Sequence, residues 1–164
     1  MKNAREVLLL KSSDITNRIK GRVAIVGIGN ILRGDDGLGP KFIEILKSRN
    51  VRASLFDCGT APENYVFPIL TSSSDTVILI DAADLGEAAG SVRVFELNEI
   101  SNVSFSTHNP SPRLFTDLLK TGKEDIYIFV VSVQPKTTAL GASLSDEVLK
   151  GLDLLAGVFC EALK

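Results

Sequence analysis

The chain has 164 residues, a length typical of one domain with its own apolar core, and 45% of its residues are hydrophobic. Its formal net charge is −2, and its 18 basic and 20 acidic residues form no long run of one sign, so a basic nucleic-acid-binding surface is not expected. The single histidine, His108, and the two cysteines, Cys58 and Cys160, exclude zinc fingers, four-thiolate sites and three-histidine zinc centres.

The expected compartment follows from three features. Two cysteines far apart in the sequence are not a disulfide framework, which suits a reducing environment. No apolar run reaches the roughly 18 residues of a membrane span. The segment 1–22 lacks the longer apolar region and the small-residue cleavage site of a signal peptide. We therefore expect a cytoplasmic protein with no membrane and no nucleic acid as partner.

The first half of the chain alternates helical and strand patterns. Apolar residues near a 3.6-residue period predict a helix within 4–20. Short apolar runs predict strands at 21–29, 51–57 and 75–81, the kind found in parallel sheets covered on both faces. We expect 30–39 to be a loop, 40–47 a helix, and 63–70 a short helix disturbed by Pro68.

The second half continues the pattern. The alternating segment 91–97 predicts an edge strand, and the loop that follows it contains His108. A helix is expected from Pro112 to Lys120, with Gly122 ending it, and then a strand at 125–135. Apolar residues spaced by three and four from Leu144 to Leu163 predict a C-terminal helix that packs on the sheet.

This order of elements predicts an α/β fold with three layers. We expect a doubly wound, mostly parallel twisted sheet of about five strands, with helices on both faces. Residues 1–164 are expected to form a single domain, in which 1–20 are an N-terminal helical extension and 21–164 the core.

Polar residues gather where ligands bind in such sheets, outside the carboxyl ends of the strands. Asp35 and Asp36 follow the first predicted strand, Asp81 ends the third, and His108 lies in the loop after the fourth. If the first and third strands are neighbours, Asp36, Asp81 and His108 converge. Two carboxylates and one imidazole suit a divalent transition metal and leave a position for water or substrate.

Simpler interpretations stay open for each residue. Asp81 alone could cap a turn, and His108 could cap the following helix. The adjacent acids Asp35 and Asp36 repel each other and need a cation or solvent to stay ionised, which makes them more informative. Cys58 is either a nucleophile with His108 as its base or a buried apolar thiol.

The glycines after the first strand do not indicate a dinucleotide site. Gly27 and Gly29 could let a backbone approach a ligand closely. A dinucleotide fingerprint needs a third glycine at position 32, which is Leu32, so that function is disfavoured.

Four motifs occur together in the order of a known family. Gly29-Asn30 with GDDG at 34–37, then DCGTAPENY at 57–65, IDAADLG at 80–86 and THN at 107–109 resemble the hydrogenase maturation endopeptidases, in particular the hydrogenase 3 branch. The likeness runs from about residue 21 to the C-terminus and leaves 1–20 unexplained. Within STHNPSPRLF the residues that follow His108 are proline-rich and depart from the family pattern. This departure could alter the shape of the loop and the precursor that is recognised, but it leaves the ligands intact.

The resemblance implies a hydrolase that removes a C-terminal extension from the precursor of a nickel-iron hydrogenase large subunit after nickel insertion. It also implies that the metal-contacting and catalytic residues are Asp36, Asp81 and His108, with Asp36 favoured over Asp35. The cofactor is expected to be nickel supplied by the precursor, although another divalent metal would also fit. We prefer nickel as the anchor that positions and polarises the scissile amide for attack by water, over a resident metal that generates hydroxide.

Two other classes fit part of the pattern. A phospho-receiver domain would use Asp35, Asp36, Asp81, Thr107 and Lys136, but it has no need of His108, and here a glycine-rich loop separates the acidic pair from the strand. A non-catalytic nickel-binding maturation module would keep the three ligands without cleavage.

Overall fold

The computed structural model describes residues 10–105 and 112–164, and within them a six-stranded sheet forms the centre of the protein. The strands are β1 (Val23–Ile28), β2 (Ser54–Gly59), β3 (Thr76–Asp84), β4 (Val92–Glu96), β5 (Ser104–Phe105) and β6 (Tyr127–Val133). Their order is β2-β1-β3-β6-β4, and β5 pairs with the end of β3. The first four strands in that order are parallel, whereas β4 is an antiparallel edge strand, as its alternating sequence predicts.

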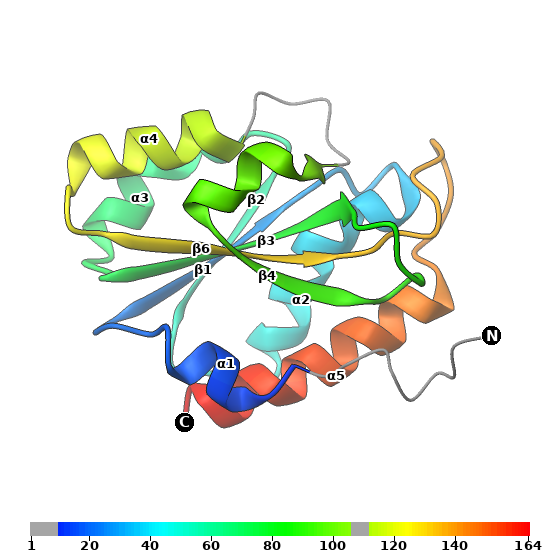
Figure 1. Cartoon of the computed structure of the whole chain (residues 1–164), viewed down its shortest axis with the longest axis horizontal. Helices are drawn as coiled ribbons and strands as arrows, with labels where there is room; N and C mark the ends of the chain where they lie inside the picture. The colour runs from blue at the N-terminus through cyan, green and yellow to red at the C-terminus, as the bar shows by residue number, and fades with distance from the viewer. Residues whose placement is uncertain (1–9, 106–111) are drawn as a thin grey trace.

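Helices cover both faces of the sheet (Figure 1). The α-helices are α1 (Ser12–Thr16), α2 (Leu38–Lys47), α3 (Val66–Thr71), α4 (Pro112–Gly122) and α5 (Asp146–Ala162). The 3-10 helices are η2 (Gly34–Gly37), η3 (Pro62–Tyr65) and η4 (Leu97–Asn102). Helices α3 and α4 lie on one face, and α1, α2 and α5 lie on the other (Figure 1). None of the helices over the described ranges is long and apolar enough to cross a membrane.

Alternation along β3 explains why the sheet has a core on each side. Ile78 and Ile80 pack in a cluster with residues of α2 and α5. Val77 and Leu79 point the other way and pack with residues of α3 and α4. Because both faces are apolar, the strand reads as a continuous hydrophobic run. The predicted three-layer, doubly wound architecture is therefore confirmed.

The strand order reverses between β1 and β3, which are adjacent, as the convergence of Asp36 and Asp81 requires. Their pairing ends with Gly27 opposite Ile80, while β3 continues to Asp84 alongside β6. The carboxyl end of β3 therefore extends beyond its last pair with β1. This is the switch point at which α/β sheets of this kind bind ligands.

Four predictions of local structure are wrong in extent. The strand predicted at 51–57 covers Ser54–Gly59, because its pairing with β1 begins at Ser54 and runs to Gly59. Within the described part of 4–20, the helix covers only Ser12–Thr16, and beyond it the backbone of Lys20 bonds the Thr76 hydroxyl. The expected loop 30–39 contains η2 and the start of α2. The strand expected to end at Asp81 continues to Asp84, because β6 and β5 supply partners beyond that point.

Candidate active site

Two of the predicted site residues, Asp36 and Asp81, lie near each other at the switch point. Asp36 belongs to η2, which follows β1, and Asp81 is the first residue of β3 beyond its last pair with β1. Both are buried, with exposed fractions of 2% and 1%. The 3-10 helix η2 contacts β3, and the charge of Asp36 acts on the carboxyl group of Asp81.

Local backbone geometry holds Asp36 in place. The N–H of Asn30 donates to Asp36 Oδ2 at 3.0 Å. Gly29 adopts φ +145°, and a Cβ at that position would lie 1.8 Å from the carbonyl oxygen of Asp36. Only glycine allows this approach without a shift of the backbone. The Gly29-Asn30 pair therefore positions the acid that follows it.

Asp81 carries a buried oxygen that the described residues leave unsatisfied. Its Oδ1 accepts a hydrogen bond from the N–H of Ala82 at 2.8 Å, whereas Oδ2 has no hydrogen-bond partner among the described residues. Burial, and then the charge of Asp36, raise the pKa of Asp81 well above its ordinary value, against the opposing effect of the Ala82 hydrogen bond. A buried carboxylate oxygen without a partner costs free energy unless a proton or a cation occupies it.

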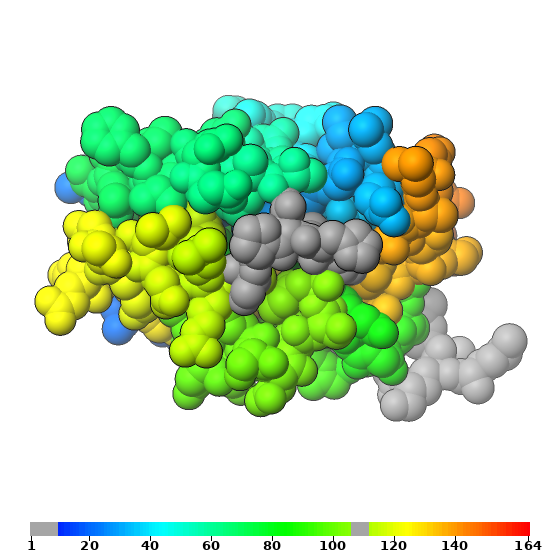
Figure 2. All heavy atoms as spheres, turned by 90° about the horizontal axis from the view of Figure 1, so that it is seen from above, coloured from blue at the N-terminus to red at the C-terminus, as the bar shows by residue number. Residues whose placement is uncertain are grey.

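Asp35, by contrast, has a structural role. Its Oδ2 accepts hydrogen bonds from the N–H groups of Lys136 and Thr137 and from the Ser145 hydroxyl, and its Oδ1 accepts one from the N–H of Ser145. These bonds join two segments, 30–37 and 136–145, which lie side by side (Figure 2). The N–H of Gly34 also bonds the carbonyl oxygen of Ala142 at 3.0 Å. The carboxylate of Asp35 is thus committed to joining them. This leaves Asp36 as the acid of the pair whose charge acts on Asp81.

His108 lies outside the described residues, so its place beside the two acids stays a prediction. Within 10–105 and 112–164, no group of three histidine, cysteine, aspartate or glutamate residues could hold a metal ion. The two acids still fit part of a metal site, because Asp81 Oδ2 is available and carboxylate oxygens bind divalent metals. A third ligand would have to come from elsewhere in the chain or from a partner.

Cys58 has the properties of a buried apolar thiol. It is 3% exposed, and burial, followed by the charge of Asp57, raises the pKa of Cys58 to about 12. The thiolate is the nucleophilic form of cysteine, and this environment suppresses it. The structure therefore disfavours the cysteine nucleophile.

The residues that would form a phospho-receiver site are not assembled as one. Asp35 is occupied by backbone amides, and the amine of Lys136 forms an ion pair with Glu147 at 2.8 Å. Thr107 lies outside the described residues. The lysine of such a site would have to reach the carboxylate cluster, so this alternative loses its main support.

The glycines around β1 serve packing of the protein itself. A Cβ on Gly27 would lie 2.4 Å from the carbonyl oxygen of Gly39, and one on Gly39 would lie 2.2 Å from that of Ile28. The close approach predicted for a ligand at Gly27 and Gly29 is therefore made by the backbone of η2 and α2.

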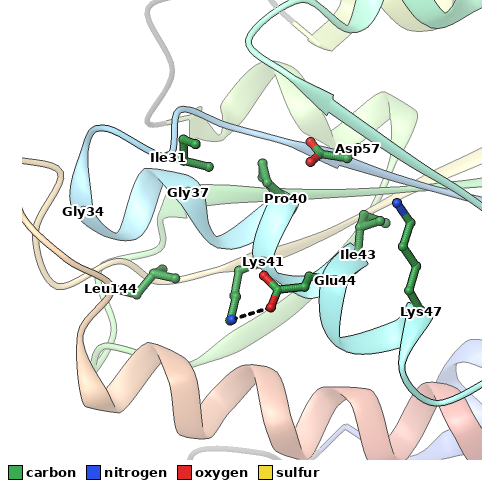
Figure 3. Close-up of a pocket in the computed structure, with 10 residues that line it drawn as sticks. All are labelled: Ile31, Gly34, Gly37, Pro40, Lys41, Ile43, Glu44, Lys47, Asp57 and Leu144. Carbon is green, nitrogen blue, oxygen red and sulfur yellow. Dashed lines mark hydrogen bonds and ion pairs between the residues drawn. The ribbon is translucent and has the colours of Figure 1, made fainter.

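A groove of about 400 Å³ runs along α2 (Figure 3). Its lining includes Ile31 and Leu144, and Lys41 and Glu44 form an ion pair in it at 2.9 Å. Gly34 and Gly37 of the GDDG motif also line it, but neither Asp36 nor Asp81 does. The groove is thus adjacent to the acids and separate from them.

Sequence reasoning missed one polar residue next to the acids. Ser132 of β6 stands opposite Asp81 in the β3–β6 register, is fully buried, and its Oγ has no hydrogen-bond partner among the described residues. The available signal was a serine in an otherwise apolar strand. Its relation to Asp81 required the register of the two strands.

The comparisons with known proteins agree on one family. The family model described as hydrogenase maturation protease matches residues 40–162. A putative hydrogenase maturation protease of Methanocaldococcus jannaschii is 29% identical over 140 residues, which cover 82% of this chain and 91% of the relative. The hydrogenase 3 maturation protease of Escherichia coli is 31% identical over 111 residues, covering 66% and 69%.

A solved structure extends this agreement to the fold. The crystal structure of a NiFe hydrogenase maturation protease from Thermococcus kodakarensis superimposes with a TM-score of 0.81 and 28% identity, covering 92% of this chain and 99% of that one. The fold is thus that of a maturation endopeptidase, a hydrolase. The chain belongs to the hydrogenase maturation protease family.

Proposed function

We propose that this protein removes the C-terminal extension of the nickel-loaded precursor of a nickel-iron hydrogenase large subunit. Membership of the maturation protease family supports the reaction class. The observation that carries the site is the buried Oδ2 of Asp81, without a partner among the described residues and near the charge of Asp36. A carboxylate left in this state is suited to a cation that arrives with the substrate.

In this proposal Asp36, Asp81 and His108 contact nickel that belongs to the precursor. The metal, when bound, supplies Lewis-acid polarisation of the scissile amide. The residues of this chain hold and orient it, and the anchor makes nickel loading a condition for cleavage. The two free thiols suit processing in the reducing cytoplasm, which is where we place it.

The test is processing of a purified large-subunit precursor with and without nickel, followed by intact mass. We expect a shortened subunit from the nickel-loaded precursor alone. Cleavage of the nickel-free precursor would contradict the anchor. Absence of cleavage in both would favour a non-catalytic nickel-binding module.

Single substitutions test which residues are needed for processing. His108→Ala is expected to abolish processing while the unfolding temperature stays that of the wild type. Asp84→Asn is a matched control, because Asp84 is an exposed acid on the same strand as Asp81. Retained processing by His108→Ala would remove the histidine from the site.

A further inference from the structure

Ser132 and Asp81 stand next to each other on one face of the sheet. They are register partners in parallel strands, so their side chains point the same way. Asp81 shares its face with Val77 and Leu79, and Ser132 shares its face with Val130; these three apolar residues belong to the cluster beneath α3 and α4. Neighbouring strands lie about 4.8 Å apart, which is within reach of a serine and a carboxylate.

Both side chains are buried, and each has an oxygen without a hydrogen-bond partner among the described residues. Ser132 is 0% exposed and Asp81 is 1% exposed. The atoms concerned are Ser132 Oγ and Asp81 Oδ2. More than nine in ten buried polar groups in proteins are paired, so two such atoms on adjacent strands call for an explanation. The rest of β6 is apolar apart from Tyr127. An alanine at position 132 would avoid the free-energy cost of burying an unpaired hydroxyl.

The chemistry of metal-binding carboxylates supplies that explanation. Such carboxylates are themselves held by hydrogen bonds, and these fix their orientation. The N–H of Ala82 already holds Oδ1 of Asp81, but the described residues provide no donor for Oδ2. A serine hydroxyl turns about a single bond and donates one proton. The two oxygens do not bond each other in this structure. A turn of the Ser132 side chain about its single bond would direct the hydroxyl towards Oδ2 on the neighbouring strand.

We propose that Ser132 is a positioning residue of the candidate active site, whose hydroxyl orients the carboxylate of Asp81 for contact with a divalent metal. This inference rests on the metal contact in the proposed function. Ser132 itself touches neither the substrate nor the metal. Its effect is transmitted through Asp81.

The experiment measures the dissociation constant of Ni²⁺ by calorimetry, together with the unfolding temperature of the metal-free protein. For Ser132→Ala we expect Ni²⁺ affinity to fall by about 10- to 100-fold. We expect the unfolding temperature to stay the same or rise, because the variant removes a hydroxyl with no partner among the described residues. A merely structural serine would give the reverse pattern.

Ser74→Ala is the matched control. Ser74 is also buried, but its hydroxyl shares a 2.8 Å hydrogen bond with that of Ser72, and it precedes β3 at the opposite end. This variant should lower the unfolding temperature and leave Ni²⁺ affinity within about twofold of the wild type.

The possible failures can be told apart. Wild-type Ni²⁺ affinity in Ser132→Ala would overturn the role of Ser132 and leave the proposed function standing. A wild-type protein that binds no Ni²⁺ would overturn both the metal contact and the positioning role. A protein that binds Ni²⁺ with the expected Ser132 dependence, but cleaves no precursor, would overturn only the proteolytic function.

Discussion

The two ends of β3 satisfy their polar groups in opposite ways. At the amino end, the buried Thr76 hydroxyl accepts the N–H of Lys20 at 2.8 Å and donates to the carbonyl oxygen of Lys20 at 2.7 Å. Nearby, the amine of Lys123 bonds the Ser74 carbonyl oxygen and Asp75. At the carboxyl end, Asp81 and Ser132 each keep a buried oxygen without a partner among the described residues.

This difference separates stability from function along a single strand. A satisfied polar group such as Thr76 contributes to stability, whereas an unsatisfied one costs it. Within the described ranges of these strands, the unsatisfied groups lie at the end where ligands bind in this class of sheet. Changes at the two ends should therefore act on different properties.

The largest expected effect is on catalysis, at the carboxyl end. Asp81→Asn should lower kcat/KM for the nickel-loaded precursor by about a thousandfold, because the loss of one metal contact removes roughly 4 kcal/mol of transition-state stabilisation. The measurement is the rate of subunit shortening. Asp84→Asn should retain the wild-type rate, and equal loss in both variants would refute the assignment.

Asp35→Ala should have the largest effect on stability. The variant leaves the part-buried N–H groups of Lys136, Thr137 and Ser145 without their acceptor, at an expected cost of about 3 kcal/mol in the free energy of unfolding. Urea denaturation measures it. A stable Asp35→Ala protein would show that Asp35 does not hold the two loops together.

Thr76→Val tests the amino end of β3. Removal of a hydroxyl that bonds the Lys20 backbone twice should cost about 1–3 kcal/mol of unfolding free energy, with no change in Ni²⁺ affinity. The same urea titration and calorimetry apply. If this variant lost metal affinity, the contrast between the two ends would break down.

The smallest expected effect is a gain in stability. The raised pKa of Asp81 means that unfolding releases its proton, so the metal-free wild type loses stability as the pH rises above the ordinary value of 3.8 towards the folded value. Asp81→Asn should avoid this loss and be more stable by about 1 kcal/mol at neutral pH. The gain should vanish below pH 3.8, and a gain that is independent of pH would contradict this origin.

Much of the fold was predictable because strands buried in a parallel sheet have continuous apolar sequences. The convergence of Asp36 and Asp81 followed from the rule that strand ends meet at a switch point. The continuation of β3 to Asp84 was not predictable, because partners on β5 and β6 sustain it and no local signal marks it. The two-residue strand β5 is too short to have a pattern of its own.

The parts of the site that could not be predicted also depend on contacts between distant segments. The role of Asp35 depends on backbone amides of Lys136, Thr137 and Ser145, and an amide carries no sequence signature. Ser132 becomes informative only when the β3–β6 register places it opposite Asp81. The part played by His108 stays a prediction, since that residue lies outside the described ranges.

The hydrogen bonds of Asp35 also affect how the protein is made. Lys136 and Ser145 lie 101 and 110 positions later in the sequence than the acid they hold. Contacts at this separation form late, because a long loop must close first. A nascent chain that has emerged only as far as β3 has both acids of its GDDG segment and Asp81, but not the amides that anchor Asp35. Assembly of the catalytic end is therefore tied to the completion of synthesis.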